Sequence, residues 1–267
     1  MAHYTAISRL EHSAKTWRRF DNFRFFAGER TAPIVAAEFP KACVAFPIAW
    51  VENDGSYEPI ALLGLQETEN LFVDARHRWI GTYTPAHFRT QPFRLIQTDE
   101  DRLTLGVRED LGLILDSAAG NPFFNEQGEL SEALQPVVDM LRKLEANRAA
   151  TQRATQALKD ADLLEPWNIA PTVNGQQLKL GGLYRLSQQK LNSVDAETLA
   201  DLRDKGALAM AYCQQISQQL IQRLEKLHEQ RAKSKIKQST HPLDQGGFGL
   251  GDDEGISFGG MASDDDE

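Results

Sequence analysis

Cysteine is scarce in this chain of 267 residues, which has two, Cys43 and Cys213, far apart in the sequence. Their spacing fits no zinc motif, and two cysteines make no disulfide framework. We therefore expect both to be small buried hydrophobic residues in a reducing compartment.

Long hydrophobic runs are also missing. No segment approaches the roughly 18 consecutive apolar residues of a membrane span, so we expect no membrane insertion. Residues 1–8 contain no basic region followed by an apolar one, which a cleavable secretion signal requires. We expect a cytoplasmic location, with export to the cell surface by an uncleaved signal as the alternative.

An excess of positive charge is missing too. The chain carries 29 Lys and Arg residues against 38 Asp and Glu residues, a net charge of −9. Residues 241–267 hold eight of the acidic residues and no Lys or Arg, so the rest of the chain is close to neutral. Because a nucleic-acid-binding surface needs a basic patch, we expect no nucleic-acid partner.

The signature motifs of familiar enzymes do not occur. The chain has no Walker loop, no Gly-x-Ser-x-Gly elbow, no His-Glu-x-x-His helix and no dinucleotide-binding fingerprint. The common nucleotide-binding, hydrolase and redox classes therefore receive no support from motifs.

What the chain does contain is 41% hydrophobic residues, enough to fill a core. Apolar runs at 48–51 and 60–65 flank Asp54-Gly55, a turn signal that predicts an antiparallel pair. We expect further strands at 71–73, 93–96, 103–107 and 113–115, with a turn at 98–101. The aromatic and arginine-rich segment 17–26 is expected to pack onto the domain, and an exposed cation–π surface is the alternative.

The second half of the chain has the spacing of helices. Apolar residues recur at three- and four-residue steps from Leu134 to Leu144, which predicts an amphipathic helix that begins near Leu134. Asp195 is the expected N-cap of a helix that ends before Gly206. A long helix is predicted over 207–235, and one of its faces would carry Ala209, Cys213, Ile216, Leu220, Leu224 and Leu227.

These patterns predict an α+β protein. Its strand-rich, antiparallel N-terminal half, residues 1–125, would pack with a helical C-terminal half, residues 126–238. The latter includes a small hairpin near 177–187 around Gly181-Gly182.

Residues 239–267 are rich in glycine and acidic residues, which predicts a disordered acidic tail. Such a tail is either a solubilising segment or a dock for a basic partner. Residues 246–252 also resemble one imperfect copy of a calcium-binding repeat, which accompanies export without a cleaved signal.

Residues 78–93 combine aromatic rings, prolines and arginines. Trp79, Tyr83, His87 and Phe88 are candidates to stack on a sugar or to hold a peptide, and Arg89 is a candidate to pair with a carboxylate or phosphate. These five are the predicted ligand-binding residues. In the alternative interpretation the rings are core anchors and the arginines extend along the surface.

Asp74, His77 and His87 are the candidate metal ligands. Two imidazoles and a carboxylate can bind a transition metal as a facial triad with open positions. That arrangement would give a metal-dependent enzyme, oxygenase-like or hydrolytic. The order Asp-Ala-Arg-His at 74–77 departs from the His-x-Asp order of cupin-like oxygenases, and we predict no cofactor, with the transition metal as the alternative.

Segments 33–51, 62–74, 79–93 and 182–208 resemble the corresponding parts of the bacterial SapC family. The resemblance implies a protein of about this size, linked by name to a surface layer, with no established catalytic residue. It does not concern the peptide-transporter permease of the same name, which would require several membrane spans.

The sequence thus predicts a non-enzymatic accessory or interaction protein of a bacterial cell-surface or nutrient-uptake system. We expect a protein or small-molecule partner, the latter a peptide or a sugar. The metal-dependent enzyme centred on Asp74, His77 and His87 is the alternative.

Overall fold

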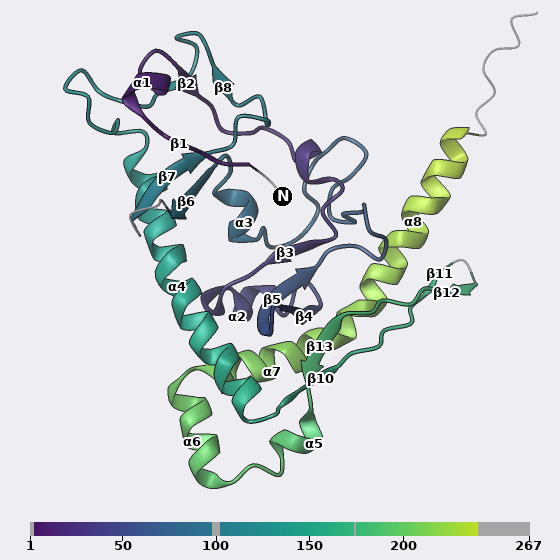
Figure 1. The fold of residues 1–267 in the computed structure, drawn as a ribbon. Coiled ribbons are helices and arrows are strands. Elements are labelled where there is room, and N and C mark those ends of the chain that lie inside the picture. The colour runs from purple at the N-terminus through teal and green to yellow at the C-terminus, as the bar shows by residue number, and fades with distance from the viewer. Residues whose placement is uncertain (1–2, 98–101, 174, 240–267) are drawn as a thin grey trace, which may run out of the picture. The chain divides into compact units, whose positions relative to one another are not determined.

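A computed structural model of the chain describes residues 3–97, 102–173 and 175–239 (Figure 1). The predicted turn at 98–101 lies outside these residues, as does the predicted disordered tail beyond Ser239. Contacts divide the chain into one compact unit, Met1–Arg231, and a second unit, Ala232–Glu267. The elements below belong to the first unit, apart from the end of the last helix.

The largest sheet has five antiparallel strands in the order β10-β13-β4-β5-β3. Its central pair confirms the predicted hairpin, because Asn53 of β4 is opposite Ser56 of β5. Asp54 and Gly55 form the turn with φ values of 47° and 74°, as a two-residue hairpin turn requires. The strands are β3 (Thr31–Pro33), β4 (Ile48–Asn53), β5 (Ser56–Leu62), β10 (Leu164–Pro166) and β13 (Leu183–Leu186).

Two smaller sheets of three strands each contain the remaining N-terminal strands. One has the order β1-β7-β6, and its antiparallel β6–β7 pair confirms the strands predicted at 93–96 and 103–107. The other has the order β8-β2-β9. Their bounds are β1 (Thr5–Ala6), β2 (Thr16–Trp17), β6 (Phe93–Gln97), β7 (Leu103–Val107), β8 (Ile114–Leu115) and β9 (Asn121–Pro122).

The prediction of a strand at 71–73 was wrong. Its backbone makes a single antiparallel bridge, Val73 with Trp79. The reason is local, because Asp74 accepts hydrogen bonds from the backbone N–H groups of Arg76 and Arg78 and so folds the chain into a tight loop directly after Val73.

Residues 177–187 form the second arm of a hairpin longer than the predicted one. The arm pairs with residues 164–173 through β13 with β10, a bridge from Leu180 to Ile169, and β12 (Gln176–Gln177) with β11 (Thr172–Val173). The hairpin thus closes where Val173 is opposite Gln176, and Gly175 has a φ of 78°. Gly181 and Gly182 lie within the arm rather than at the turn.

The longest helix is α4 (Gln135–Asp160), and it confirms the predicted start at Leu134, its N-cap. Helix α6 (Ala196–Asp204) confirms both predicted caps. The Asp195 carboxylate accepts the Thr198 N–H at 2.8 Å, and Gly206 is left-handed with a φ of 73°. The short helices are α1 (Arg9–His12), α2 (Phe39–Ala42), α3 (Ala86–Arg89), α5 (Gln188–Leu191) and the 3₁₀ turns η1 (Arg24–Phe26) and η2 (Ala36–Glu38).

The single helix predicted over 207–235 is interrupted. It consists of α7 (Ala207–Ser217), a 3₁₀ turn η3 (Gln218–Leu220) and α8 (Ile221–Ser239). The predicted apolar face holds at Leu224, which is fully buried, but Ile216 is 51% exposed. The buried side of α7 instead includes Gln214 and Ser217, which bond to the backbone of the large sheet.

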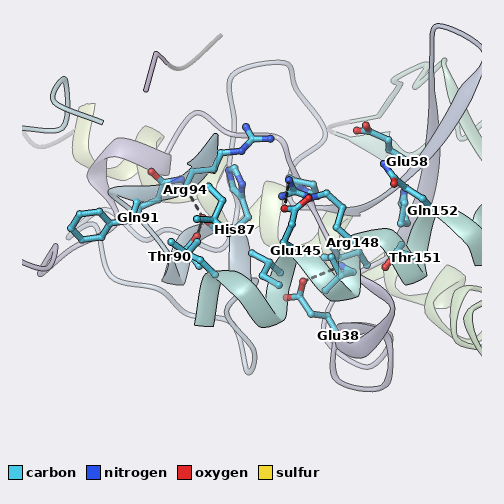
Figure 2. Close-up of a pocket in the computed structure, with 18 of the residues that line it drawn as sticks. Glu38, Glu58, His87, Thr90, Gln91, Arg94, Glu145, Arg148, Thr151 and Gln152 are labelled. Atoms are coloured by element: carbon cyan, nitrogen blue, oxygen red, sulfur yellow. Dashed lines mark hydrogen bonds and ion pairs between the residues drawn. The ribbon is translucent and has the colours of Figure 1, made fainter. Parts of the chain in front are cut away.

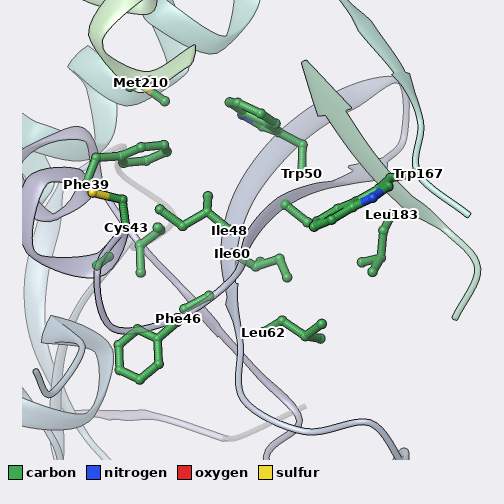
Figure 3. Packing of buried hydrophobic residues seen from close by; sticks show 14 of the residues in the cluster. Phe39, Cys43, Phe46, Ile48, Trp50, Ile60, Leu62, Trp167, Leu183 and Met210 are labelled. Atoms are coloured by element: carbon green, nitrogen blue, oxygen red, sulfur yellow. The ribbon is translucent and has the colours of Figure 1, made fainter. Parts of the chain in front are cut away.

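Two hydrophobic clusters fill the unit, and each combines residues of the strand-rich and helical halves, as the α+β prediction requires. In the larger cluster α4 packs against β5 and α7 against β4. Figure 3 shows Trp50 and Ile48 of β4 facing Phe39, Cys43 and Met210. Segment 17–26 joins these clusters with Trp17 and Phe26 almost fully buried, which confirms its predicted packing.

Cys43 and Cys213 are both free thiols, the first buried and the second half-buried. Burial raises the pKa of Cys213 to about 11, and the neighbouring thiol of Cys43 adds to the rise. The Cys213 thiol therefore stays protonated at neutral pH, and both side chains pack as small hydrophobic groups.

None of the helices in the described residues combines the length and apolar character that crossing a membrane requires.

Candidate ligand-binding cavity

A cavity of about 310 Å³ opens between α4, β6, β5 and the segment that connects β3 to η2 (Figure 2). Apolar side chains from all four of these segments line it, and ionisable side chains lie between them. The apolar residues include Ile34, Phe93, Leu95, Leu141 and Leu144, and the ionisable ones include Glu58, His87, Arg94, Glu145 and Arg148.

The cavity lies where the two hydrophobic clusters meet. Leu141 and Phe93 belong to the smaller cluster, and Ile34 belongs to the larger one. Helix α4 contributes to both, with Val138 and Leu141 in one and Ala154 in the other. Ligand sites often occur at such junctions, because packing there is interrupted.

Helix α4 presents its cavity residues at helical spacing. Leu141, Leu144, Arg148 and Thr151 lie three or four positions apart and so share one face. Thr151 also fixes the opposite wall, because its hydroxyl accepts the Ala36 N–H at 2.7 Å and donates to the Asn147 carbonyl of its own helix at 2.6 Å. This contact holds η2 against α4.

Glu38 is the most constrained charged group of the cavity and was missed by the sequence analysis. Its side chain is buried, and its carboxylate accepts hydrogen bonds from the Tyr83 hydroxyl at 2.8 Å, the Ala86 N–H at 2.7 Å and the Val35 N–H at 3.1 Å. Three neutral donors thus compensate the buried charge. The available signal was a single glutamate inside the apolar run 34–39.

Tyr83, one of the predicted ligand-binding residues, is held by this glutamate. Burial raises the pKa of Tyr83 to about 12, and the hydrogen bond and charge of Glu38 add to the rise. Arg89 completes the chain of contacts, since its guanidinium donates to the Tyr83 hydroxyl at 3.3 Å and lies 5.7 Å from the ring centroid. Tyr83 and Arg89, both predicted to bind a ligand, are thus in contact with each other.

Trp79 and Phe88 lie in an aromatic cluster with Phe23 and Phe72. Phe88 has no exposed surface, and Trp79 is half-buried with its indole N–H donated to the Tyr83 carbonyl at 2.9 Å. These contacts match the alternative interpretation of the two rings as core anchors, and their ligand-binding role stays a prediction.

His87 is the member of the predicted set that lines the cavity; the other four, all within the described part of the chain, do not. It lies on α3, with its Nε2 3.3 Å from a carboxylate oxygen of Glu29 and both side chains about one-third exposed. Of the residues predicted to bind a ligand, His87 is therefore the one in position to contact a molecule in the cavity.

Asp74, His77 and His87 do not assemble. No group of three His, Cys, Asp or Glu side chains that could hold a metal ion occurs in residues 3–97, 102–173 and 175–239. Asp74 instead pairs with Arg78 at 2.8 Å, and the Arg78 backbone N–H and guanidinium hold the pKa of its carboxyl below the usual value. His77 is exposed in the same loop with a φ of 58°. The metal-dependent enzyme therefore stays a hypothesis, and no cluster of metal-ligating side chains in the described residues favours it.

Comparison with known families gives one finding. A family model described as SapC matches residues 7–224, which include every wall of the cavity apart from Tyr4. Neither the search of curated proteins nor the search of solved structures found a match.

Proposed function

The chain belongs to the SapC family, and we propose that it is a non-enzymatic accessory protein that binds a small ligand, a peptide or a sugar, in the cavity beside α4. In this proposal the protein serves a bacterial cell-surface or nutrient-uptake system. It works from the cytoplasm, or from the cell surface if the chain is exported.

The observation that carries the proposal is the cavity itself. Its volume of about 310 Å³ lies at the lower end of the range of roughly 300–1,000 Å³ that small-molecule sites occupy. An apolar lining with a few ionised groups is the usual composition of such sites, because burial supplies affinity and the polar groups fix orientation.

The state of the buried polar groups favours binding over catalysis. A general base or nucleophile must be free to reach a substrate. Here the Thr90 hydroxyl donates to the Ala86 carbonyl and the Thr151 hydroxyl to the Asn147 carbonyl, while Glu38 already accepts three hydrogen bonds. These groups are engaged in holding the walls together.

The proposal predicts that filling the cavity abolishes binding. A Leu144→Trp variant places an indole in the cavity from α4, so we expect peptides or sugars that bind the wild type to lose at least about tenfold in affinity, measured by isothermal titration calorimetry. Ala146→Trp is the matched control, since Ala146 is exposed on the same helix and does not line the cavity.

A ligand that binds Leu144→Trp as tightly as the wild type would place its site elsewhere and contradict the proposal. Circular dichroism of both variants is needed first, to show that each retains the helix content of the wild type.

A further inference from the structure

Most ionisable groups of the cavity already have a partner within the protein. Glu145 and Arg148 form an ion pair at 3.1 Å, and His87 lies 3.3 Å from Glu29. The Glu38 carboxylate is occupied by its three donors. Each of these groups therefore has a polar partner without a ligand.

Arg94 and Glu58 are different. Both side chains are exposed at the cavity, Arg94 from β6 and Glu58 from β5, and Figure 2 draws them on separate walls. The Arg94 guanidinium lies 5.9 Å from the ring centroid of Tyr4, and no carboxylate of the described residues pairs with it. Glu58 likewise has no cationic partner among these residues. Among the described residues, the cavity thus offers Arg94 as a cation and Glu58 as an anion, each without an oppositely charged partner.

Most neutral polar groups of the lining are already engaged, the exposed Gln152 amide apart, and their state favours one of the two ligand classes. Gln91 and Tyr4 bond to each other at 2.8 Å, and the hydroxyls of Thr90 and Thr151 donate to carbonyl groups of the backbone. A sugar carries a hydroxyl on most of its carbons, and hydroxyls left unpaired against an apolar lining are costly. A short peptide instead concentrates its polarity in two terminal charges and a few amides.

We propose that the cavity takes a short zwitterionic peptide with apolar side chains, its terminal carboxylate at Arg94 and its terminal ammonium at Glu58. This inference rests on the proposed function, because it names the ligand class of the same cavity. Each terminus gains a charge-assisted hydrogen bond, which is stronger than a neutral one. The apolar side chain contacts the lining that includes Phe93, Leu141 and Leu144.

The test uses calorimetric titration of the full-length protein with the leucine dipeptide and tripeptide, beside maltose and the disaccharide of N-acetylglucosamine. We expect one of the peptides to bind. Arg94→Gln and Glu58→Gln should each weaken binding at least about tenfold, because each removes one charge-assisted contact. Arg153→Gln is the matched control, since Arg153 is exposed on α4 outside the cavity.

Blocked peptides assign each terminus to its residue. Amidation of the carboxylate should weaken binding to the wild type but not to Arg94→Gln, and acetylation of the amine should weaken binding to the wild type but not to Glu58→Gln. If blocking a terminus costs affinity only while its protein partner is present, the two losses are not additive. Such a result shows that this terminus contacts that side chain.

Three results would overturn the inference. If Arg94→Gln and Glu58→Gln bind the peptide as tightly as the wild type, the peptide termini do not contact Arg94 and Glu58. If a sugar binds, no peptide binds, and the sugar binding is lost in Leu144→Trp, the proposed function stands but the ligand is not a peptide. No binding of any of the four probes would count against both.

Discussion

At the scale of single residues, the buried carboxylate of Glu38 is the feature that orders the cavity wall. It joins η2 to the start of α3 through Tyr83 and Ala86. A buried carboxylate is tolerated when hydrogen-bond donors replace the water it has lost. The residues around it are therefore coupled, and Tyr83 is the most accessible probe of that coupling.

Tyr83→Phe should destabilise the protein at neutral pH by roughly 1–2 kcal/mol, because Glu38 loses one donor. The pKa of Tyr83 is raised from 10.0 to about 12 in the folded protein, so its phenol stabilises the fold fully below pH 10. That contribution is lost as the pH rises from 10 to 12. Urea unfolding across this interval should show a steeper fall in the unfolding free energy for the wild type than for the variant.

Tyr212→Phe serves as the control, since Tyr212 is 50% exposed. Equal slopes for the wild type and Tyr83→Phe would mean that the Tyr83 phenol is not held by Glu38.

Trp79 tests whether the aromatic stretch is core or binding surface. Trp79→Ala should lower the unfolding free energy by roughly 2–4 kcal/mol, because it leaves a cavity among Phe23, Phe72 and Phe88 and removes the hydrogen bond to the Tyr83 carbonyl. The neighbouring Ile80→Ala, at a side chain that is 45% exposed, should cost much less. If thermal unfolding shows the two variants to be equally stable, Trp79 is not a core anchor.

At the scale of elements, α7 shows how polar residues can form the buried side of a helix. The Gln214 side chain donates to the Ile48 carbonyl at 3.2 Å and accepts the Leu186 N–H at 3.2 Å, and the Ser217 hydroxyl accepts the Ile48 N–H at 2.9 Å. The helix thus satisfies backbone groups of β4 and β13 that would otherwise be buried without partners.

Gln214→Leu should therefore destabilise the protein even though leucine is more hydrophobic. It leaves a buried carbonyl and a buried N–H without these partners, and each such group costs about 1–3 kcal/mol. We expect a lower midpoint of urea unfolding with an unchanged slope. Gln222→Leu, at an exposed position of α8, should unfold like the wild type, and an unchanged midpoint for Gln214→Leu would contradict this role of α7.

Elements with strong local signals could be predicted from the sequence. The Asp54-Gly55 turn, the stripe that begins at Leu134 and the caps at Asp195 and Gly206 each depend on residues close together in the chain. The break at η3 could not be predicted in this way. The buried face of α7 is defined by Gln214 and Ser217, whose shared partner Ile48 is more than a hundred residues away in the sequence.

At the scale of the whole molecule, the cavity depends on contacts that no local pattern contains. Ala36 meets Thr151, and Glu38 meets Tyr83, across long stretches of chain. The fold class and the family could therefore be predicted from sequence patterns, and His87, which lines the cavity, was one of the five predicted ligand-binding residues. They did not reveal that α4, β5 and β6 leave a hollow where the two hydrophobic clusters meet.

The central claim is that this hollow, and not the exposed loop of Asp74 and His77, holds the ligand. The most direct test is to titrate ¹⁵N-labelled protein with a peptide or sugar that calorimetry has shown to bind, and to map the changes in amide chemical shift onto the chain. We predict shifts concentrated at residues 33–35, 57–59, 90–95 and 141–152. Shifts confined to residues 74–80, with the cavity amides unchanged, would contradict the account.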